Sequence, residues 1–355
     1  NITSAHFDYS QLSSKYNMLL AGGLPNIFNP EMKAGALNDL GVYCVYPVID
    51  LFGEPIVDNK VPSLVERFGE NPFTVLNTQT GRWQNRKKWW IGLGIQSEVG
   101  RTATTYNTKE WVDRVRSEGK MTGNVLPSNT SIFDPVLCEL MYKWFCPNGG
   151  HILDPFAGGS VRGIVAHYLG YKYSGIDIRQ EQVDSNREQA LNILDVTNQP
   201  QWYVGDSNIV LDGFDDEKFD MVFSCPPYGD LEKYSELDGD ISNMSYDDFM
   251  VAYESIIAKA CAKLKTGGHA VFVVGEFRDK KGFYHGFVPH TINAFWKCGM
   301  KLYNEAILQN SLASCAIRAA GNMKSSKLVK MHQNILDFVK ENYPEYNEDK
   351  QLSFG

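Results

Sequence analysis

Two short segments, separated by about seventy residues, contain the residue types that can perform chemistry. The first covers residues 154–160 (D-P-F-A-G-G-S) and the second covers residues 223–228 (F-S-C-P-P-Y). Each follows an apolar stretch that predicts a buried strand. Gly158 and Gly159 lack side chains, so a ligand can approach the backbone, and the helix expected next would offer unpaired N–H groups. The first segment therefore predicts a binding loop for a nucleoside cofactor, with a plain strand-to-helix turn as the alternative.

Two further acids follow the next predicted strands. Asp177 comes about twenty residues after the glycine-rich loop, where an acid can hydrogen-bond ribose hydroxyls. Asp206 follows the third predicted strand, where its carboxylate can meet an adenine amine. Either acid alone could be a helix cap or a turn residue, but three consecutive strand ends of this kind favour a cofactor site. The cofactor-binding residues predicted from these segments are Asp154, Pro155, Phe156, Gly158, Gly159, Ser160, Asp177, Ile178, Asp206 and Ser207.

The second segment has the features of a rigid platform for a planar base. Pro226 and Pro227 fix two backbone dihedrals and remove two N–H donors, which leaves carbonyl oxygens presented at the strand end. Tyr228 adds an aromatic face on which a base can stack. Chemistry on an exocyclic amine needs acceptors for its two hydrogens, and a base in a duplex must leave the stack to reach them. We therefore predict Cys225, Pro226, Pro227 and Tyr228 as the catalytic residues.

Strands and helices are expected to alternate from residue 131 onwards. Helical periodicity and capping residues predict helices at 135–145, 160–169, 179–194, 245–264 and 288–298. Apolar stretches predict strands at 151–153, 171–176, 201–204, 219–223, 269–274, 301–308 and 335–339. This alternation predicts an α/β, Rossmann-like fold with a mostly parallel, doubly wound sheet. Ligands of such sheets bind beyond the carboxyl ends of the strands, which is where both segments fall.

The composition sets limits on the class of protein. The net charge of −8 argues against a surface that is basic throughout, but it leaves room for a local basic face. Seven cysteines are scattered without zinc spacing, so no metal site is predicted and reduced thiols in a cytoplasmic protein are expected. No apolar run is long enough to span a membrane, and the first residues lack the features of a secretory signal.

The two segments, in this order, resemble the signature of the DNA amino-methyltransferases. In that family a D-P-F-x-G cofactor loop is paired with a [D/N/S]-P-P-[Y/F/W] catalytic turn, and here the matching residues are 154–158 and 225–228. Residues 131–135 (S-I-F-D-P) resemble the family segment that lines the methionine end of the cofactor, which adds Ser131 and Phe133 to the predicted cofactor-binding residues. The resemblance covers about 131–340. The strings 73–101, 154–166 and 223–234 look most like DNA methylases encoded by phages and prophages.

The resemblance implies an enzyme that transfers a methyl group from S-adenosylmethionine to the exocyclic amine of adenine or cytosine. Its expected partner is duplex DNA with the target base flipped out, as in DNA methylation by restriction–modification systems, in the cytoplasm of a bacterium or a phage-infected cell. Residues 1–120 are expected to form a smaller accessory region that contributes to DNA recognition. Residues 121–340 are expected to form the methyltransferase domain, and 341–355 a polar tail.

The chain departs from the family pattern at two positions. Ser160 replaces the last glycine of the cofactor loop, which keeps a small residue there. Cys225 stands where the family has Asp, Asn or Ser, and a thiol is a poor hydrogen-bond acceptor. Three interpretations remain open: Ser224 or the Pro226 carbonyl supplies the acceptor, Cys225 is a nucleophile for methylation at carbon 5 of cytosine, or catalysis is weakened and the protein only binds DNA. Methylation of RNA or of a free nucleotide is a further alternative.

Other residues are weaker candidates. Glu276 could face the site, and Asp230, Tyr234 and Asp240 lie in a loop that could close over the base. Trp83, Trp89 and Trp90, with Arg86, Lys87 and Lys88, predict either a DNA-contacting patch or packing of the tryptophans in the core. His285, His290 and His332 lack metal spacing and are expected to be structural.

Basic residues collect in three clusters: Arg82 to Lys88; Arg278, Lys280 and Lys281; and Arg318, Lys324, Lys327 and Lys330.

Overall fold

The computed structural model describes residues 62–95, 133–195, 197, 199–228, 237, 239–310 and 315–340. The chain from Leu64 onwards forms one compact unit. The predicted site residue Ser131, the loop residues Asp230 and Tyr234, the domain boundary at 120 and the tail 341–355 all lie outside the described residues.

An eight-stranded sheet forms the centre of this unit, in the order β1-β7-β8-β6-β5-β2-β3-β4. Its strands are β1 (Val75–Asn77), β2 (His151–Asp154), β3 (Lys172–Asp177), β4 (Gln201–Val204), β5 (Phe219–Ser224), β6 (Leu264–Val274), β7 (Met300–Gln309) and β8 (His332–Lys340). β8 pairs antiparallel with β6 and β7, and all other neighbours are parallel. The prediction of an α/β fold with a mostly parallel sheet is therefore confirmed.

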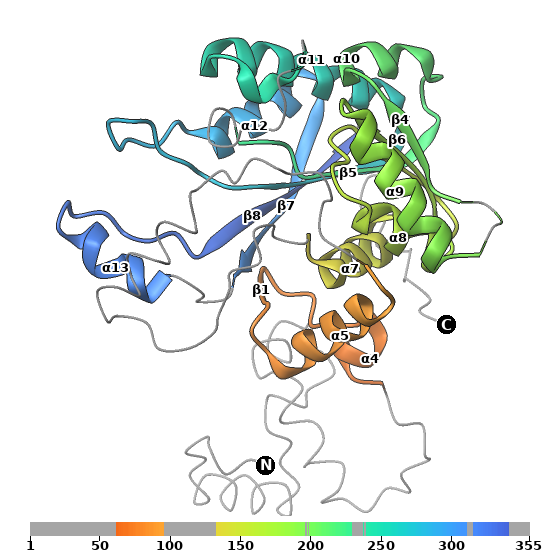
Figure 1. Cartoon of the computed structure of the whole chain (residues 1–355), viewed down its shortest axis with the longest axis horizontal. Helices are drawn as coiled ribbons and strands as arrows, with labels where there is room; N and C mark the ends of the chain where they lie inside the picture. Colours follow the sequence, from red (N-terminus) through yellow and green to blue (C-terminus); the bar gives the residue numbers. More distant parts are fainter. Residues whose placement is uncertain are drawn as a thin grey trace, which may run out of the picture. The chain divides into compact units, whose positions relative to one another are not determined.

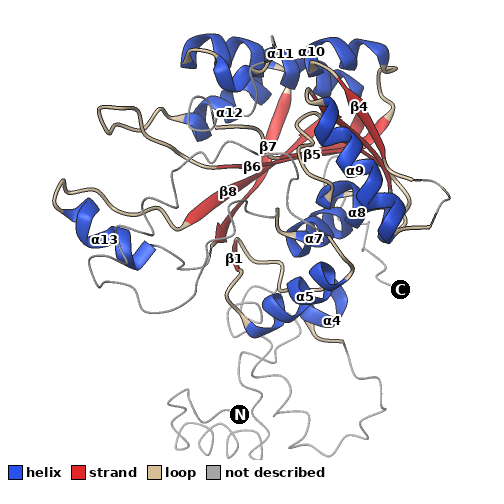
Figure 2. Ribbon diagram, in the orientation of Figure 1, coloured by secondary structure: helices blue, strands red, loops and turns tan. Residues whose placement is uncertain are grey.

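Helices cover both faces of the sheet (Figures 1 and 2). The longer ones are α5 (Gly81–Gly92), α7 (Pro135–Phe145), α8 (Val161–Tyr168), α9 (Gln180–Ile193), α11 (Tyr246–Lys263), α12 (Phe287–Lys297) and α13 (Cys315–Met323). Short helical segments are α4 (Leu64–Phe68), α10 (Ser207–Val210), η3 (Leu211–Gly213) and η5 (Ile241–Asn243). α7, α8 and α9 lie on one side of the sheet, and α10, α11 and α12 lie on the other (Figure 1). None of the described helices is long and apolar enough to cross a membrane.

Successive side chains of each central strand belong alternately to the two hydrophobic clusters on the two faces of the sheet, as expected for a sheet covered on both faces. In β5, Met221 and Phe223 belong to the cluster under α7 and α8, whereas Val222 belongs to the cluster under α11 and α12. In β6, Val271 and Phe272 divide between the two clusters in the same way. The continuous apolar runs of these strands thus reflect burial on both faces.

Capping residues set the ends of the predicted helices. Asp134 accepts a hydrogen bond from Val136 N (3.0 Å) and Pro135 occupies the first turn of α7, so this helix begins where the sequence predicts. Ser245 caps α11 by accepting from Asp248 N. Because these signals are local, the predicted bounds of α7 and α11 agree with the structure to within one residue.

The segment around α5 packs into the same unit as the sheet. Trp83 and Trp90 are fully buried, and their indole N–H groups donate to Asp134 (3.2 Å) and Glu139 (3.0 Å) of the α7 region. Lys87 pairs with Asp134 at 3.0 Å. Trp83 and Trp90 are therefore packing residues, whereas Trp89 is exposed. The alternative that all three tryptophans contact DNA is wrong, because two of them have no surface to present.

Candidate active site

A cavity of about 840 Å³ lies at the edge where the parallel strands β2 to β6 have their carboxyl ends. Its wall contains most of the predicted site residues, namely Phe133, Pro155, Phe156, Gly158, Gly159, Asp177, Ile178, Asp206, Ser207, Cys225, Pro226, Pro227 and Tyr228. Asp154 and Ser160 lie behind this wall and are fully buried. The structure therefore brings the predicted cofactor loop and the predicted catalytic turn to one cavity.

Asp177 and Asp206 each combine two roles. Asp177 accepts a hydrogen bond from Arg179 N (2.9 Å) at the start of α9, and Asp206 accepts from Asn208 N (2.8 Å) at the start of α10. Both carboxylates also line the cavity. The helix-cap interpretation and the ligand interpretation are thus compatible, because a carboxylate can accept several hydrogen bonds at once.

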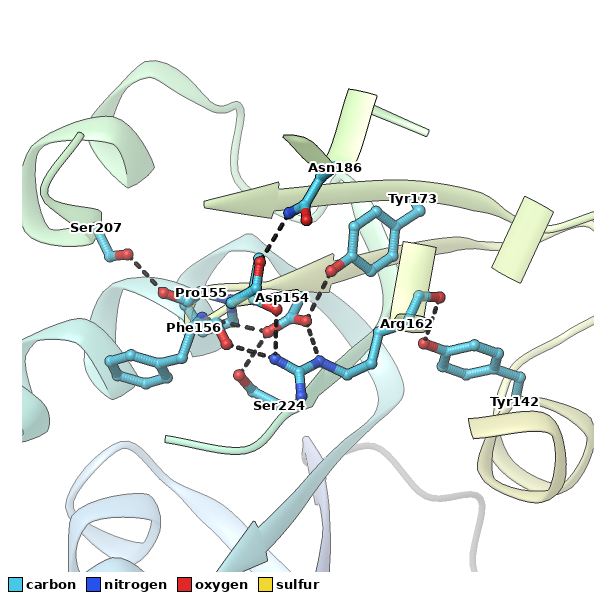
Figure 3. A network of polar contacts seen from close by, with 11 residues as sticks. Tyr142, Asp154, Pro155, Phe156, Arg162, Tyr173, Asn186, Ser207 and Ser224 are labelled. Atoms are coloured by element: carbon cyan, nitrogen blue, oxygen red, sulfur yellow. Dashed lines mark hydrogen bonds and ion pairs between the residues drawn. The ribbon is translucent and has the colours of Figure 1, made fainter. Parts of the chain in front are cut away.

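Asp154 is the centre of a buried polar network (Figure 3). Its carboxylate accepts from Arg162 Nε (2.5 Å), the Tyr173 hydroxyl (2.7 Å) and the Ser224 hydroxyl (2.6 Å). It also accepts from Phe156 N (3.2 Å) of its own loop. Burial, together with the negative charge of Asp154, raises the pKa of Tyr173 well above its usual value, so the phenol keeps the proton that it donates. Asp154 therefore positions the loop from behind instead of facing the cavity.

Arg162 carries the positive charge of this network. Its guanidinium donates to the carbonyl oxygens of Phe156 (2.5 Å) and Ala157 (2.7 Å), so it holds the loop backbone as well as Asp154. The guanidinium carbon lies 4.7 Å from the centre of the Phe133 ring, a cation–π contact. Burial alone would lower the pKa of Arg162, but the adjacent Asp154 charge holds that pKa well above its usual value. The Arg162–Asp154 ion pair therefore supports the loop.

A row of buried polar side chains on α9 holds the same loop from the other side. Asn186 donates to the Gly158 carbonyl (2.7 Å) and accepts from Gln182 (2.8 Å). One turn further along, Gln189 accepts from the Ser160 hydroxyl (3.0 Å). The sequence analysis did not predict that these residues support the loop, because amide side chains on a polar helix are usually exposed to solvent. Their spacing of three to four residues, which places them on one face of the helix, was the signal that could have identified them.

Buried and partly buried contacts also hold the predicted catalytic turn and the residue before it in place. Ser224 is fully buried and donates to Asp154, so it does not reach the cavity. The hypothesis that Ser224 supplies the acceptor missing at Cys225 is therefore wrong. Tyr228 accepts a hydrogen bond from Gln333 Nε2 (2.5 Å), and its ring contacts those of Phe277 and Phe287. The aromatic face of Tyr228 is thus fixed by contacts from β8 and from both ends of the β6–α12 connection.

The cavity wall also contains charged and polar side chains besides the predicted site residues. Glu276 lines it and accepts from the backbone N–H groups of residues 286, 287 and 288, so it caps α12. Lys330, Arg318 and His332 line the same cavity. Burial lowers the pKa of Lys330, while the charge of Glu276 opposes that shift. Asp240 lines the cavity too, and its carboxylate accepts from Ser242 N (2.9 Å).

The remaining candidates have structural contacts. Tyr246 packs against His285, with ring centres 4.2 Å apart and the ring planes tilted by 31°, and it hydrogen-bonds His290 at 2.8 Å. Within the described part of the chain, no group of three or more His, Cys, Asp or Glu side chains could hold a metal ion. The six cysteines that the structure describes form no disulfide among themselves.

Comparison with known proteins gives short or distant similarities. No family model matches the chain. The scyllo-inositol 2-dehydrogenase (NADP(+)) IolU of Bacillus subtilis is 49% identical over 47 residues, which are 13% of this chain and 14% of that protein. The uncharacterized oxidoreductase YgjR of Escherichia coli is 47% identical over 49 residues, 14% of this chain and 15% of that protein. The chain thus spans about one seventh of the length of these curated relatives.

Several similar solved structures are methyltransferases. A TehB-like SAM-dependent methyltransferase from Corynebacterium glutamicum is 17% identical, with 67% of this chain and 98% of that chain covered and a TM-score of 0.37. A protein from Thermus thermophilus, provisionally named a DNA modification methylase, is 18% identical over 38% of this chain and 50% of its own, with a TM-score of 0.29. A geranyl diphosphate methyltransferase in complex with SAM is 14% identical over 58% and 85%, with a TM-score of 0.41. With identities and scores this low, function has to be inferred from the residues of the site.

Proposed function

We propose that this protein transfers a methyl group from S-adenosylmethionine to the exocyclic amine of adenine or cytosine in DNA. One observation carries this proposal: the glycine-rich loop with its two acids and the Cys-Pro-Pro-Tyr turn line a single cavity. The two segments are also joined by a buried hydrogen bond, because Ser224, the residue immediately before Cys225, donates to Asp154 of the loop segment. Movement of one segment would therefore disturb the other.

The cofactor end of the cavity fits S-adenosylmethionine. Asp177 and Asp206 supply acceptors for ribose hydroxyls and for an adenine amine. Gly158 has a positive φ of 49°, which lets the loop backbone turn towards a ligand without a side chain in the way. Phe133 adds an aromatic wall at the same end. When bound, S-adenosylmethionine supplies an electrophilic methyl group on a sulfonium centre.

The catalytic turn supplies a fixed place for the base. Tyr228 offers a stacking surface whose orientation is set by Gln333 and neighbouring rings, so little ordering is needed when a base binds. The Pro226 carbonyl is the acceptor that we assign to the amine, since Ser224 is buried elsewhere and Cys225 accepts poorly. Orienting the amine hydrogens towards an acceptor leaves its nitrogen lone pair available to attack the methyl group. The methyl–sulfur bond of the cofactor would break as the nitrogen–carbon bond forms, and the methylated nitrogen would release one proton to water.

Two measurements test this function. We expect titration calorimetry to give a dissociation constant for S-adenosylmethionine below about 1 mM, the weak end of typical substrate affinities. We then expect label from methyl-labelled cofactor to appear in duplex DNA, and digestion to place it on N6 of adenine or N4 of cytosine. No cofactor binding would refute the whole proposal, whereas label only in RNA or in free nucleotides would refute the DNA substrate.

Replacing Cys225 with serine distinguishes amine methylation from attack on a pyrimidine ring. A hydroxyl accepts hydrogen bonds better than a thiol, so amine methylation by Cys225→Ser should be at least as fast as in the unchanged protein. Loss of a covalent nucleophile would instead reduce the rate by at least about a thousandfold. The single-turnover rate of label transfer is the measurement. Cys298→Ser, which alters a half-buried thiol outside the cavity wall, is the matched control.

A further inference from the structure

The segment between β7 and β8 has a charge opposite to that of the chain. Residues 310–331 contain Arg318, Lys324, Lys327 and Lys330 and no Asp or Glu, although the whole chain has a net charge of −8. α13 lies in this segment, beyond the start of β8 and away from the helices that cover the sheet (Figure 2). A local basic bias in an acidic chain is typical of a surface that binds an acidic partner.

A second basic segment lies in the connection between β6 and α12. There Arg278 and Tyr284 form an isolated antiparallel bridge, and the Arg278 guanidinium stacks 3.8 Å from the centre of the Tyr284 ring. Lys280 and Lys281 at the tip are exposed, and Phe283 is 71% exposed. Aromatic side chains interleaved with cations are typical of nucleic-acid-binding surfaces.

The structure brings these two segments together beside the cavity. The Lys327 side chain lies against Gly282, where an added Cβ would overlap its Nζ. Arg318 and Lys330 of the first segment line the cavity, and so does Phe277 at the base of the second segment, whose ring contacts that of Tyr228. The basic residues therefore border the end that receives the base in the proposed function.

Four lysines of this surface lack the carboxylate partners that several other lysines of the chain have. Within the described residues, Lys280, Lys281, Lys324 and Lys327 form no ion pair. By contrast, three lysines near the other end of β5 and β6 are paired: Lys259 with Asp212, Lys263 with Asp216 and Lys265 with Asp220, at 2.6 to 2.7 Å. Lysines without partners are available to phosphate groups.

We infer that Arg278, Lys280, Lys281, Lys324 and Lys327 form a surface, here called the basic face, that binds the backbone of duplex DNA flanking the target base. This inference rests on the proposed function, because that function sets which end of the cavity receives the base. Lysines on the basic face contact phosphates, and each contact releases condensed counterions, so the affinity depends steeply on salt. Phe283 and Tyr284 add apolar surface between the cations.

Charge-neutralising variants with a matched control test the basic face. The variant K280Q/K324Q/K327Q and the control K259Q/K263Q/K265Q change the net charge equally, but at opposite ends of the sheet. Binding of a labelled duplex of about 25 base pairs is measured by fluorescence anisotropy over a series of salt concentrations. We expect the first variant to bind at least tenfold more weakly at about 0.1 M salt, with the slope of log K against log salt reduced by about 2 to 3. The control should bind like the unchanged protein.

Three outcomes would overturn the inference. Equal affinities for the two triple variants would show that the basic face does not contact DNA. Tighter binding of duplex RNA than of duplex DNA would refute the assigned partner. Absence of binding to any nucleic acid by the unchanged protein would refute the surface, even if S-adenosylmethionine binds. Conversely, DNA binding through the basic face without cofactor binding would refute the proposed function while leaving the surface in place, so the two failures are distinguishable.

Discussion

The substitution Asp154→Asn should lower the free energy of unfolding by about 3–5 kcal/mol, because it leaves the Arg162 guanidinium buried without its counter-charge. Asp154 is fully inaccessible and Arg162 is 5% exposed, so water cannot solvate the unpaired cation. The amide also cannot accept all the bonds that Tyr173 and Ser224 now donate. Denaturation by urea, followed by circular dichroism, measures the change.

An exposed ion pair is the control for this prediction. Asp184 and Arg187 lie on the surface of α9 at 3.4 Å, with side chains 59% and 49% exposed. Asp184→Asn should therefore change the free energy of unfolding by less than about 1 kcal/mol. A similarly small effect of Asp154→Asn would contradict the role that we assign to the buried network.

The substitution Asp177→Asn should weaken S-adenosylmethionine binding by about 10- to 100-fold. The amide keeps an oxygen that can accept from Arg179 N, but it removes the carboxylate that pairs with the buried Arg179 guanidinium at 3.7 Å, so some loss of stability is expected as well. It loses the negative charge that strengthens hydrogen bonds from ribose hydroxyls, and a hydrogen bond to a charged group contributes about 1.5–3 kcal/mol. Titration calorimetry measures the affinity, and a thermal melt without cofactor checks the fold.

Glu188→Gln makes the same change of charge on an exposed position of α9 and should leave the cofactor affinity unaltered. If both variants bind S-adenosylmethionine like the unchanged protein, Asp177 acts only as a helix cap. If both bind more weakly to the same extent, a general electrostatic effect explains the loss instead of a contact from Asp177.

Much of the fold is predictable because its signals are local. The bounds of α7 follow from Asp134 and Pro135, which start a helix wherever an apolar periodic segment comes next. The central strands are recognisable from apolar runs of four to eight residues. β1 and α13 were not predicted, since a three-residue strand and a short helix carry too weak a pattern to be distinguished from a loop.

The sequence by itself determined the fold class and the two segments of the candidate site, because residue type and spacing along the chain are enough to predict a strand, a turn and the edge of the sheet at which they end. Only the tertiary structure decided what each side chain does there. In that structure the Asp154 side chain contacts Arg162 and Ser224 instead of facing the cavity, and the Lys327 side chain lies against Gly282. These contacts join residues far apart in the chain. They form because a buried charge must find a partner and because the sheet fixes which strand ends become neighbours, and neither condition can be read from local sequence.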